Sequence, residues 1–185
     1  GIIDFLLGTV WKPEGIIYGF KPLFGALPLI TGTLICTFGA MLIAIPLSLG
    51  SAIFIAELAP SWIKTVAKPA IELLAGIPSI VYGFFGLVVL IPWLQNTFNI
   101  SSAEGWAAGS IILAIMAIPT ITTLAEDAIT SVPQYFKEGS LALGATKWQT
   151  INKVIIPSAL SGITAAIILG IGRAVGETMA ILMVC

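Results

Sequence analysis

The sequence predicts an all-α fold: a polytopic transmembrane helical bundle with about four spans. Of its 185 residues, 58% are hydrophobic and only 9% are charged, whereas an ordinary soluble domain has about 25% charged residues. The mean hydropathy is +1.08, and the apolar runs are long enough to cross a bilayer. Because these runs are continuous and do not alternate with a period of two residues, they indicate helices and not a β-barrel.

The same composition argues against several functions. The net charge of −1 argues against nucleic acid as a partner. There is no histidine, and Cys36 and Cys185 both lie in apolar runs, so neither a disulfide framework nor a Cys/His metal site is expected. The sequence contains no G-x-S-x-G motif and no glycine-rich phosphate loop. We therefore expect no catalytic residue and no cofactor in this chain, and a nucleotide that drives it must bind elsewhere.

Four apolar runs follow a mixed lead-in at residues 1–25, whose aromatic residues suit a membrane–water interface. The predicted spans are residues 27–55, 71–94, 106–129 and 159–185. Pro46 predicts a kink in the first span, Gly76 and Pro78 interrupt the second, and Pro119 lies inside the third. Because the chain starts without Met and stops inside an apolar run, we expect residues 26–185 to be a membrane domain that is incomplete at both ends.

The polar connections predict the orientation. Residues 57–68 form a short turn, residues 95–105 form a loop without Lys or Arg, and residues 131–158 form the longest polar interruption. The first and last of these hold five lysines, whereas the lead-in holds only Lys12 and Lys21. By the positive-inside rule, loops 57–68 and 131–158 should face the cytoplasm, with the lead-in and loop 95–105 outside.

Loop 131–158 has internal order. Gly144 predicts the end of one helix, and Thr146 with Gln149 has the spacing of a capping box that starts another. Three apolar residues of this second helix fall on one face: Trp148, Ile151 and Ile155. Two short amphipathic helices suit contact with a partner protein, and a connector lying on the lipid surface is the alternative.

Most charges fall near the predicted cytoplasmic ends of spans and are interpreted as interfacial residues: Glu57, Glu72, Glu126 and Asp127. Arg173 differs because it is the only arginine and lies near the middle of the fourth apolar run. A charge at the bilayer centre costs at least about 2.5–3.5 kcal/mol, so such residues usually serve a pathway or a partner. The guanidinium suits an oxyanion. Glu177, four residues on, would share its helix face and pair with it when no anion is bound; a purely structural ion pair is the alternative.

Hydroxyl groups close to helix breaks extend this candidate pathway. Ser79 and Tyr82 follow the break at Pro78, and Thr120, Thr122 and Thr123 follow Pro119. Broken helices at mid-membrane often mark transport sites. Hydrogen bonding of each hydroxyl to its own helix backbone is the alternative.

The spacing within loop 131–158 resembles the cytoplasmic signature of importer-type ABC permeases. That signature reads E-A-A, three residues, G, nine residues, I, one residue, L-P. The matching positions here keep the spacing, with small and apolar replacements: Glu138, Gly139, Ser140, Gly144, Val154, Ile156 and Pro157.

Four further segments are similar to the permease subunits of the high-affinity phosphate importer: AIFIAELAP at 52–60, ELLAGIPSIVYG at 72–83, EDAITSVP at 126–133 and GRAVGETMA at 172–180. The ELAP turn and the GETMA ending look more like the C-type than the A-type subunit.

This resemblance implies a permease of the cell inner membrane that forms half of a translocation pathway. It implies a second, A-type permease, two ATP-binding subunits that use ATP and Mg²⁺, and an extracytoplasmic phosphate-binding protein. Loop 131–158 would dock on an ATPase subunit through the signature residues, and the family's membrane-embedded arginine and glutamate correspond to Arg173 and Glu177. The alternatives are a permease for sulfate or molybdate, an ATP-independent channel or secondary transporter, and a purely structural membrane subunit.

Overall fold

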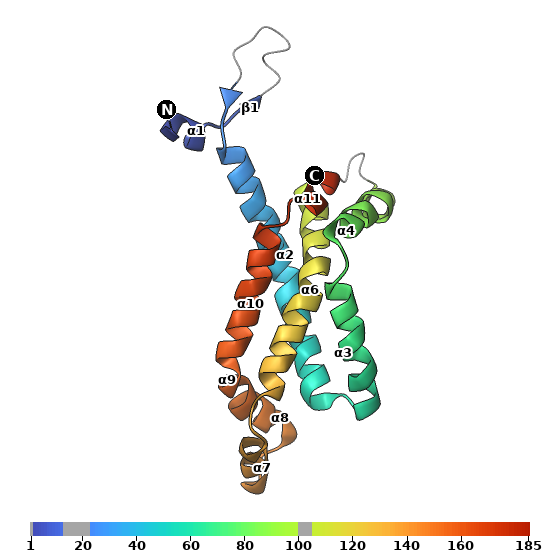
Figure 1. Ribbon diagram of the computed structural model, residues 1–185, viewed down its shortest axis with the longest axis vertical. Coiled ribbons are helices and arrows are strands. Elements are labelled where there is room, and N and C mark those ends of the chain that lie inside the picture. Colours follow the sequence, from blue (N-terminus) through green and yellow to red (C-terminus); the bar gives the residue numbers. More distant parts are fainter. Residues whose placement is uncertain (1, 13–22, 100–104) are drawn as a thin grey trace.

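The computed structural model describes residues 2–12, 23–99 and 105–185, so Lys21 and residues 100–104 of loop 95–105 lie outside the described residues. Three long helices run side by side along the molecule: α2 (Leu27–Ile53), α6 (Trp106–Thr130) and α10 (Leu160–Val175) (Figure 1). By length and composition, three helical stretches among the described residues could cross a membrane: 27–58, 79–98 and 106–130. The number is four if the bent pair 147–158 and 160–175 counts as one span. The predicted all-α, polytopic bundle is confirmed.

The lead-in contains the only strands among the described residues. Helix α1 (Ile2–Leu7) precedes β1 (Trp11–Lys12), which pairs antiparallel with β2 (Leu23–Phe24). This hairpin lies at the opposite end of the bundle from α7 and α8 (Figure 1).

Small residues bring the long helices close together. Buried alanines of α2, such as Ala40 and Ala44, pack with Ala117 and Ala125 of α6 in the main core. A β-carbon built at Gly39 would lie 2.6 Å from the Ser110 hydroxyl oxygen of α6. Such close contact stabilises helix pairs in lipid, where the hydrophobic effect does not hold helices together.

Gly162 offers a direct test of this packing. A β-carbon there would lie 2.5 Å from the β-carbon of Ala128. Alanine has no alternative rotamer that would move this β-carbon away. Gly162→Ala should therefore force α10 away from α6 and lower the stability by about 1–3 kcal/mol relative to Gly172→Ala. Gly172 is the control because the same helix holds it and nothing lies within 4 Å of its built β-carbon. Thermal unfolding in detergent measures the difference; equal melting temperatures would contradict tight packing.

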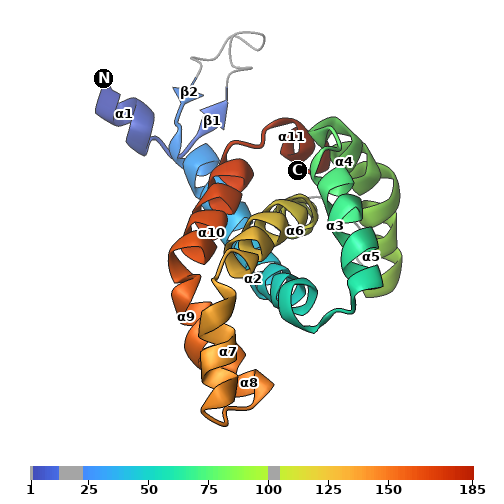
Figure 2. The same ribbon diagram turned by 60° about the horizontal axis from the view of Figure 1, so that its bottom comes forward.

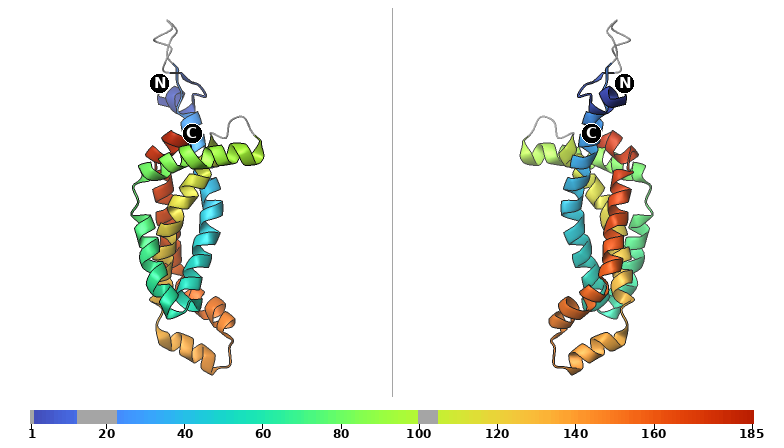
Figure 3. Two further views of the ribbon diagram at one scale, coloured as in Figure 1. Left: turned by 90° about the vertical axis from the view of Figure 1, so that its right-hand side faces the viewer. Right: turned by 90° about the vertical axis from the view of Figure 1, so that its left-hand side faces the viewer.

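The predicted second span is broken at Gly76 and Pro78 as expected, but its predicted boundaries of 71–94 are wrong. Of the polar turn predicted at 57–68, only Ala59 and Pro60 lie outside helices. A π-helical turn η2 (Phe54–Leu58) extends α2, and α3 (Ser61–Ala75) begins directly after Pro60. Gly76 and Pro78 then separate α3 from α4 (Ser79–Phe85), η3 (Gly86–Leu90) and α5 (Ile91–Phe98). Figure 3 shows residues 79–98 lying crosswise over the end of the bundle, so residues 71–94 do not form one straight span.

The predicted fourth span is also interrupted. Helix α10 ends at Val175, and a second helix α11 (Met179–Val184) follows a short break. Helix α11 packs closely on α4, since a β-carbon at Gly83 would lie 2.9 Å from the Ala180 α-carbon. The apolar run at 159–185 predicted one continuous helix, whereas packing of α11 on α4 accompanies a break after Val175.

Loop 131–158 forms a foot of short helices that stands off the end of the bundle (Figure 2). It comprises α7 (Gln134–Ala142), α8 (Lys147–Thr150), a π-helical turn η4 (Ile151–Ile155) and α9 (Ile156–Ser158). The capping box of Thr146 and Gln149 is confirmed. Of the three apolar residues predicted to share one helix face, Ile151 and Ile155 are buried. Trp148 is 61% exposed, because α8 lies beyond the bundle core.

Candidate functional site

Arg173 joins three helices at the point where α3 ends. It lies in the last turn of α10, and its side chain is half-buried. Its Nη1 donates to the Thr120 hydroxyl of α6 (2.6 Å), and its Nη2 donates to the Ala75 carbonyl of α3 (3.2 Å). The last carbonyls of a helix lack partners within the helix and carry partial negative charge, so a cation is stabilised there.

The two hydroxyl residues predicted from the break at Pro78 lie around this same helix end. The Tyr82 hydroxyl, which is buried, donates to the Leu74 carbonyl of α3 (2.8 Å). Ser79 is the first residue of α4, and its hydroxyl makes no hydrogen bond with any described residue. The fold thus brings Arg173, from a distant part of the sequence, to the break that Ser79 and Tyr82 border.

Glu177 does not form the ion pair with Arg173 that the four-residue spacing predicts. Gly176 ends α10, so Glu177 lies in the break before α11 and does not share a helix face with Arg173. Its carboxylate accepts a hydrogen bond from the Ala180 backbone N–H (3.3 Å) in the first turn of α11. The carboxylate therefore contacts the start of the next helix.

The three threonines that follow Pro119 use their hydroxyls differently. Thr123 bonds to its own helix, at the carbonyls of Pro119 and Thr120, and Thr122 reaches the Ser48 carbonyl of α2 at 3.5 Å. Only Thr120 among them contacts Arg173. The guanidinium carries more N–H donors than these two bonds use, so it can bind a further acceptor such as an oxyanion without leaving α6.

The signature residues of loop 131–158 lie on the foot. Glu138 and Gly139 are exposed on α7, and the Ser140 hydroxyl lies 3.0 Å from the Thr150 hydroxyl of α8. Gly144 has a positive φ of 84° in the turn between α7 and α8. Pro157 lies in α9, just before a bend of 69° into α10.

Large apolar side chains are exposed on the same foot. Leu143 is 90% exposed, and Tyr135 and Trp148 are each more than 60% exposed. No residue of α7 is buried. An exposed apolar surface of this kind indicates contact with another protein or with the membrane surface.

Ion pairs at this end of the bundle were not predicted from the sequence. Lys68 of α3 binds Glu126 (2.8 Å) and Asp127 (2.6 Å) of α6, and Lys137 of α7 binds Glu57 of η2. The hydrogen bonds to Asp127 and then to Glu126 raise the pKa of Lys68 above its ordinary value. Both basic loops therefore lie at one end, and three carboxylates interpreted as interfacial join separate helices there.

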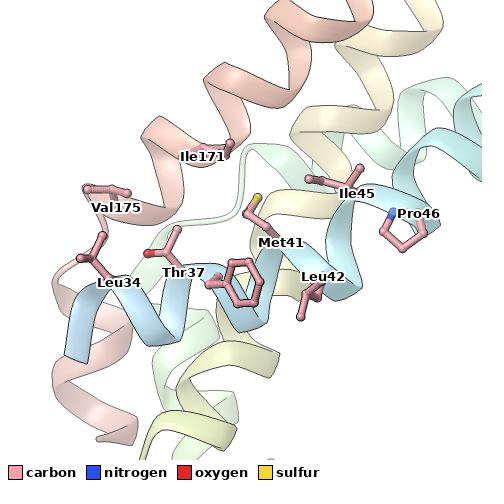
Figure 4. A pocket seen from close by; sticks show the side chains of 9 residues that line it. Leu34, Thr37, Met41, Leu42, Ile45, Pro46, Ile171 and Val175 are labelled. Carbon is pink, nitrogen blue, oxygen red and sulfur yellow. The ribbon is translucent and has the colours of Figure 1, made fainter. Parts of the chain in front are cut away.

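An apolar groove on the bundle does not coincide with the Arg173 site. It has a volume of about 660 Å³ and lies between α2 and α10 (Figure 4). Its lining contains one hydroxyl residue, Thr37, among apolar side chains: Leu34, Phe38, Met41, Leu42, Ile45, Pro46, Ile171 and Val175. A groove of this chemistry does not suit a charged solute.

Comparison with known proteins gives consistent results. Residues 44–185 match a family model described as binding-protein-dependent transport system inner membrane component. The chain is 46% identical over 182 residues to the probable ABC transporter permease protein YqgH of Bacillus subtilis, covering 98% of this chain and 58% of that relative. It is 41% identical over 197 residues to the phosphate transport system permease protein PstC of Haemophilus influenzae, covering 96% of this chain and 61% of that relative.

Solved structures agree on the architecture. An inward-facing structure of the MetNI methionine ABC transporter matches with a TM-score of 0.61 and 25% identity, covering 82% of this chain and 68% of that chain. An amino acid ABC transporter matches with a TM-score of 0.58 and 25% identity, covering 90% of this chain and 74% of that chain. The chain spans about three fifths of the length of the two curated relatives above.

Proposed function

Because this chain belongs to the family of binding-protein-dependent transport system inner membrane components, we propose that it is the C-type permease subunit of an ATP-driven phosphate importer. The observation that carries the proposal is Arg173, the only arginine of the chain, which lies half-buried at the meeting point of three helices with N–H donors to spare. Relatives at 41% and 39% identity are named phosphate transport permeases, which supports phosphate as the solute.

The proposal includes the partners of a complete importer. A second, A-type permease forms the other half of the pathway, an extracytoplasmic binding protein delivers phosphate, and two ATP-binding subunits hydrolyse ATP with Mg²⁺. This chain is then a transport subunit and not itself an enzyme. Loop 131–158 and the 57–68 segment face the cytoplasm, in keeping with their five lysines and their common end of the bundle.

In this mechanism the foot moves with the ATP-binding subunits, and Arg173 binds the solute. Closure of the ATP-binding subunits displaces α7 and α8, and the docking surface includes the exposed Leu143, which follows α7, and Trp148 of α8. The long helices rock, and the Arg173 region opens to each side in turn. Phosphate oxygens bind the guanidinium bidentately.

Uptake by the reconstituted complex tests the proposal. Radiolabelled phosphate should enter proteoliposomes only when ATP is supplied on the side of the membrane where the ATPase subunits are bound. Unlabelled phosphate should compete with the radiolabelled phosphate for uptake. Stronger competition by sulfate or molybdate would assign another oxyanion. Uptake without the ATPase subunits would indicate a channel or a secondary transporter and overturn the proposal.

Thr120 should assist the arginine. Thr120→Val removes the hydroxyl that holds Nη1, and the loss of one hydrogen bond to a charged group costs about 1.5–3 kcal/mol. The phosphate concentration that gives half-maximal uptake should therefore rise by roughly 10- to 100-fold. Thr123→Val is the matched control, because its hydroxyl bonds only to its own helix. Equal effects of the two substitutions would show that Thr120 acts only on helix stability.

A further inference from the structure

The helix α7, at the tip of the foot, has one side-chain bond to a span of the bundle. Lys137 of α7 hydrogen-bonds to Glu57 of η2, with side-chain exposures of 24% and 13%. The other side-chain bond of α7 among the described residues joins Ser140 to Thr150, within the foot itself. Since α7 buries no residue, apolar packing does little to hold it to the spans.

The partner carboxylate lies at a junction of three elements. Glu57 is in η2, the π-helical turn that ends the first span, and π-helical turns often mark functional positions. Lys64 of α3 donates to the Ala56 carbonyl of the same turn (2.5 Å). Lys137 therefore attaches α7 to the point where α2 passes into α3.

Helix α3 leads from this junction to the solute site. It begins at Ser61, with two residues between it and η2, and its last carbonyls accept hydrogen bonds from Arg173 and Tyr82. No residue of α3 is buried, and polar bonds at both ends and at Lys68 hold it in place. A displacement of α7 is thus passed through Glu57 to a helix whose far end contacts Arg173.

Resting on the proposed function, we infer that the Glu57–Lys137 ion pair positions α7 and transmits its movement to α3 and the Arg173 site. Both side chains are largely removed from water, so loss of one partner leaves the other charge unpaired. The two residues are positioning residues: they contact neither solute nor nucleotide.

Charge exchange in the complete importer tests the inference. The measured quantity is phosphate transported per ATP hydrolysed in proteoliposomes, together with the amount of ATPase subunit that copurifies. Glu57→Lys and Lys137→Glu alone should each lower the ratio at least tenfold while ATPase subunits remain bound. The double exchange should restore at least half of the original ratio. Lys153→Glu is the matched control, because it makes the same charge change on the same foot at an exposed lysine that has no ion pair with any described residue.

Two substitutions that remove the charges without reversing them test the inference if charge reversal prevents assembly of the complex. Glu57→Gln and Lys137→Met should each lower the ratio, and the double variant should lower it no further than the worse single variant. Unchanged ratios in the single variants, or independent multiplication of the two effects, would overturn the inference. Failure of the unaltered complex to transport phosphate would instead overturn the proposed function.

Discussion

Arg173→Gln is expected to reduce phosphate uptake by roughly 100-fold or more. Glutamine keeps a hydrogen-bonding amide near Thr120 and Ala75 but loses the charge and the planar fork that pairs with two phosphate oxygens. Two hydrogen bonds to a charged group contribute about 1.5–3 kcal/mol each, which corresponds to a loss of this size. The measurement is initial uptake of radiolabelled phosphate in cells that depend on this importer.

Two further measurements separate solute binding from helix anchoring at this position. Arg173→Lys keeps the charge without the fork, and its uptake should lie between those of the original protein and Arg173→Gln. The amount of assembled complex, measured by copurification, should not change in either variant. Full uptake by Arg173→Gln would remove Arg173 from the pathway, and loss of assembly would favour a structural membrane subunit.

Gly144→Ala is expected to uncouple ATP hydrolysis from transport. Gly144 has a φ of 84° in the turn between α7 and α8. A left-handed conformation costs about 1–2 kcal/mol for a residue with a β-carbon. The equilibrium between this turn and other conformations should shift by roughly 5- to 30-fold, and the docking surface should lose its shape. Phosphate transported per ATP hydrolysed, measured in proteoliposomes, should fall accordingly.

Gly139→Ala provides the matched control for this prediction. Nothing lies within 4 Å of a β-carbon built at Gly139 or at Gly144, but Gly139 is inside helix α7 and has no positive φ. Alanine there restores the residue of the family signature and favours the helix by about 1 kcal/mol. Coupling should therefore be retained in Gly139→Ala. Equal losses in the two variants would mean that added bulk at the docking surface, and not the turn, is responsible.

Local patterns predicted most of the helices, because hydropathy and capping depend on neighbouring residues. The first and third spans match, with α2 and η2 covering 27–58 and α6 covering 106–130. The capping box at Thr146 and the helix end near Gly144 also match, since both are properties of a single turn. The break near Gly76 and Pro78 was visible in the sequence, but the direction of the chain after it was not.

The candidate site was predicted only in part, because the residues that contact Arg173 are far from it in the sequence. Sequence reasoning identified Arg173, Tyr82 and Ser79, yet it paired Arg173 with Glu177 by assuming that one helix continued through Gly176. Close packing of Ala180 on Gly83 places α11 on α4, and the helix breaks instead. The acceptors of Arg173 lie 53 and 98 positions away, where no local spacing could show them.

Composition, periodicity and a spaced signature are readable without a fold, so they were enough to identify a helical membrane protein, its polar segment at 131–158 and its one arginine within an apolar run. Three features appear only in the folded protein: Arg173 meets the end of α3, Glu57 binds Lys137 across 80 positions, and residues 79–98 lie crosswise. Those features depend on how helices pack against one another, and in lipid that packing follows close approach of small residues and polar bonds between distant segments.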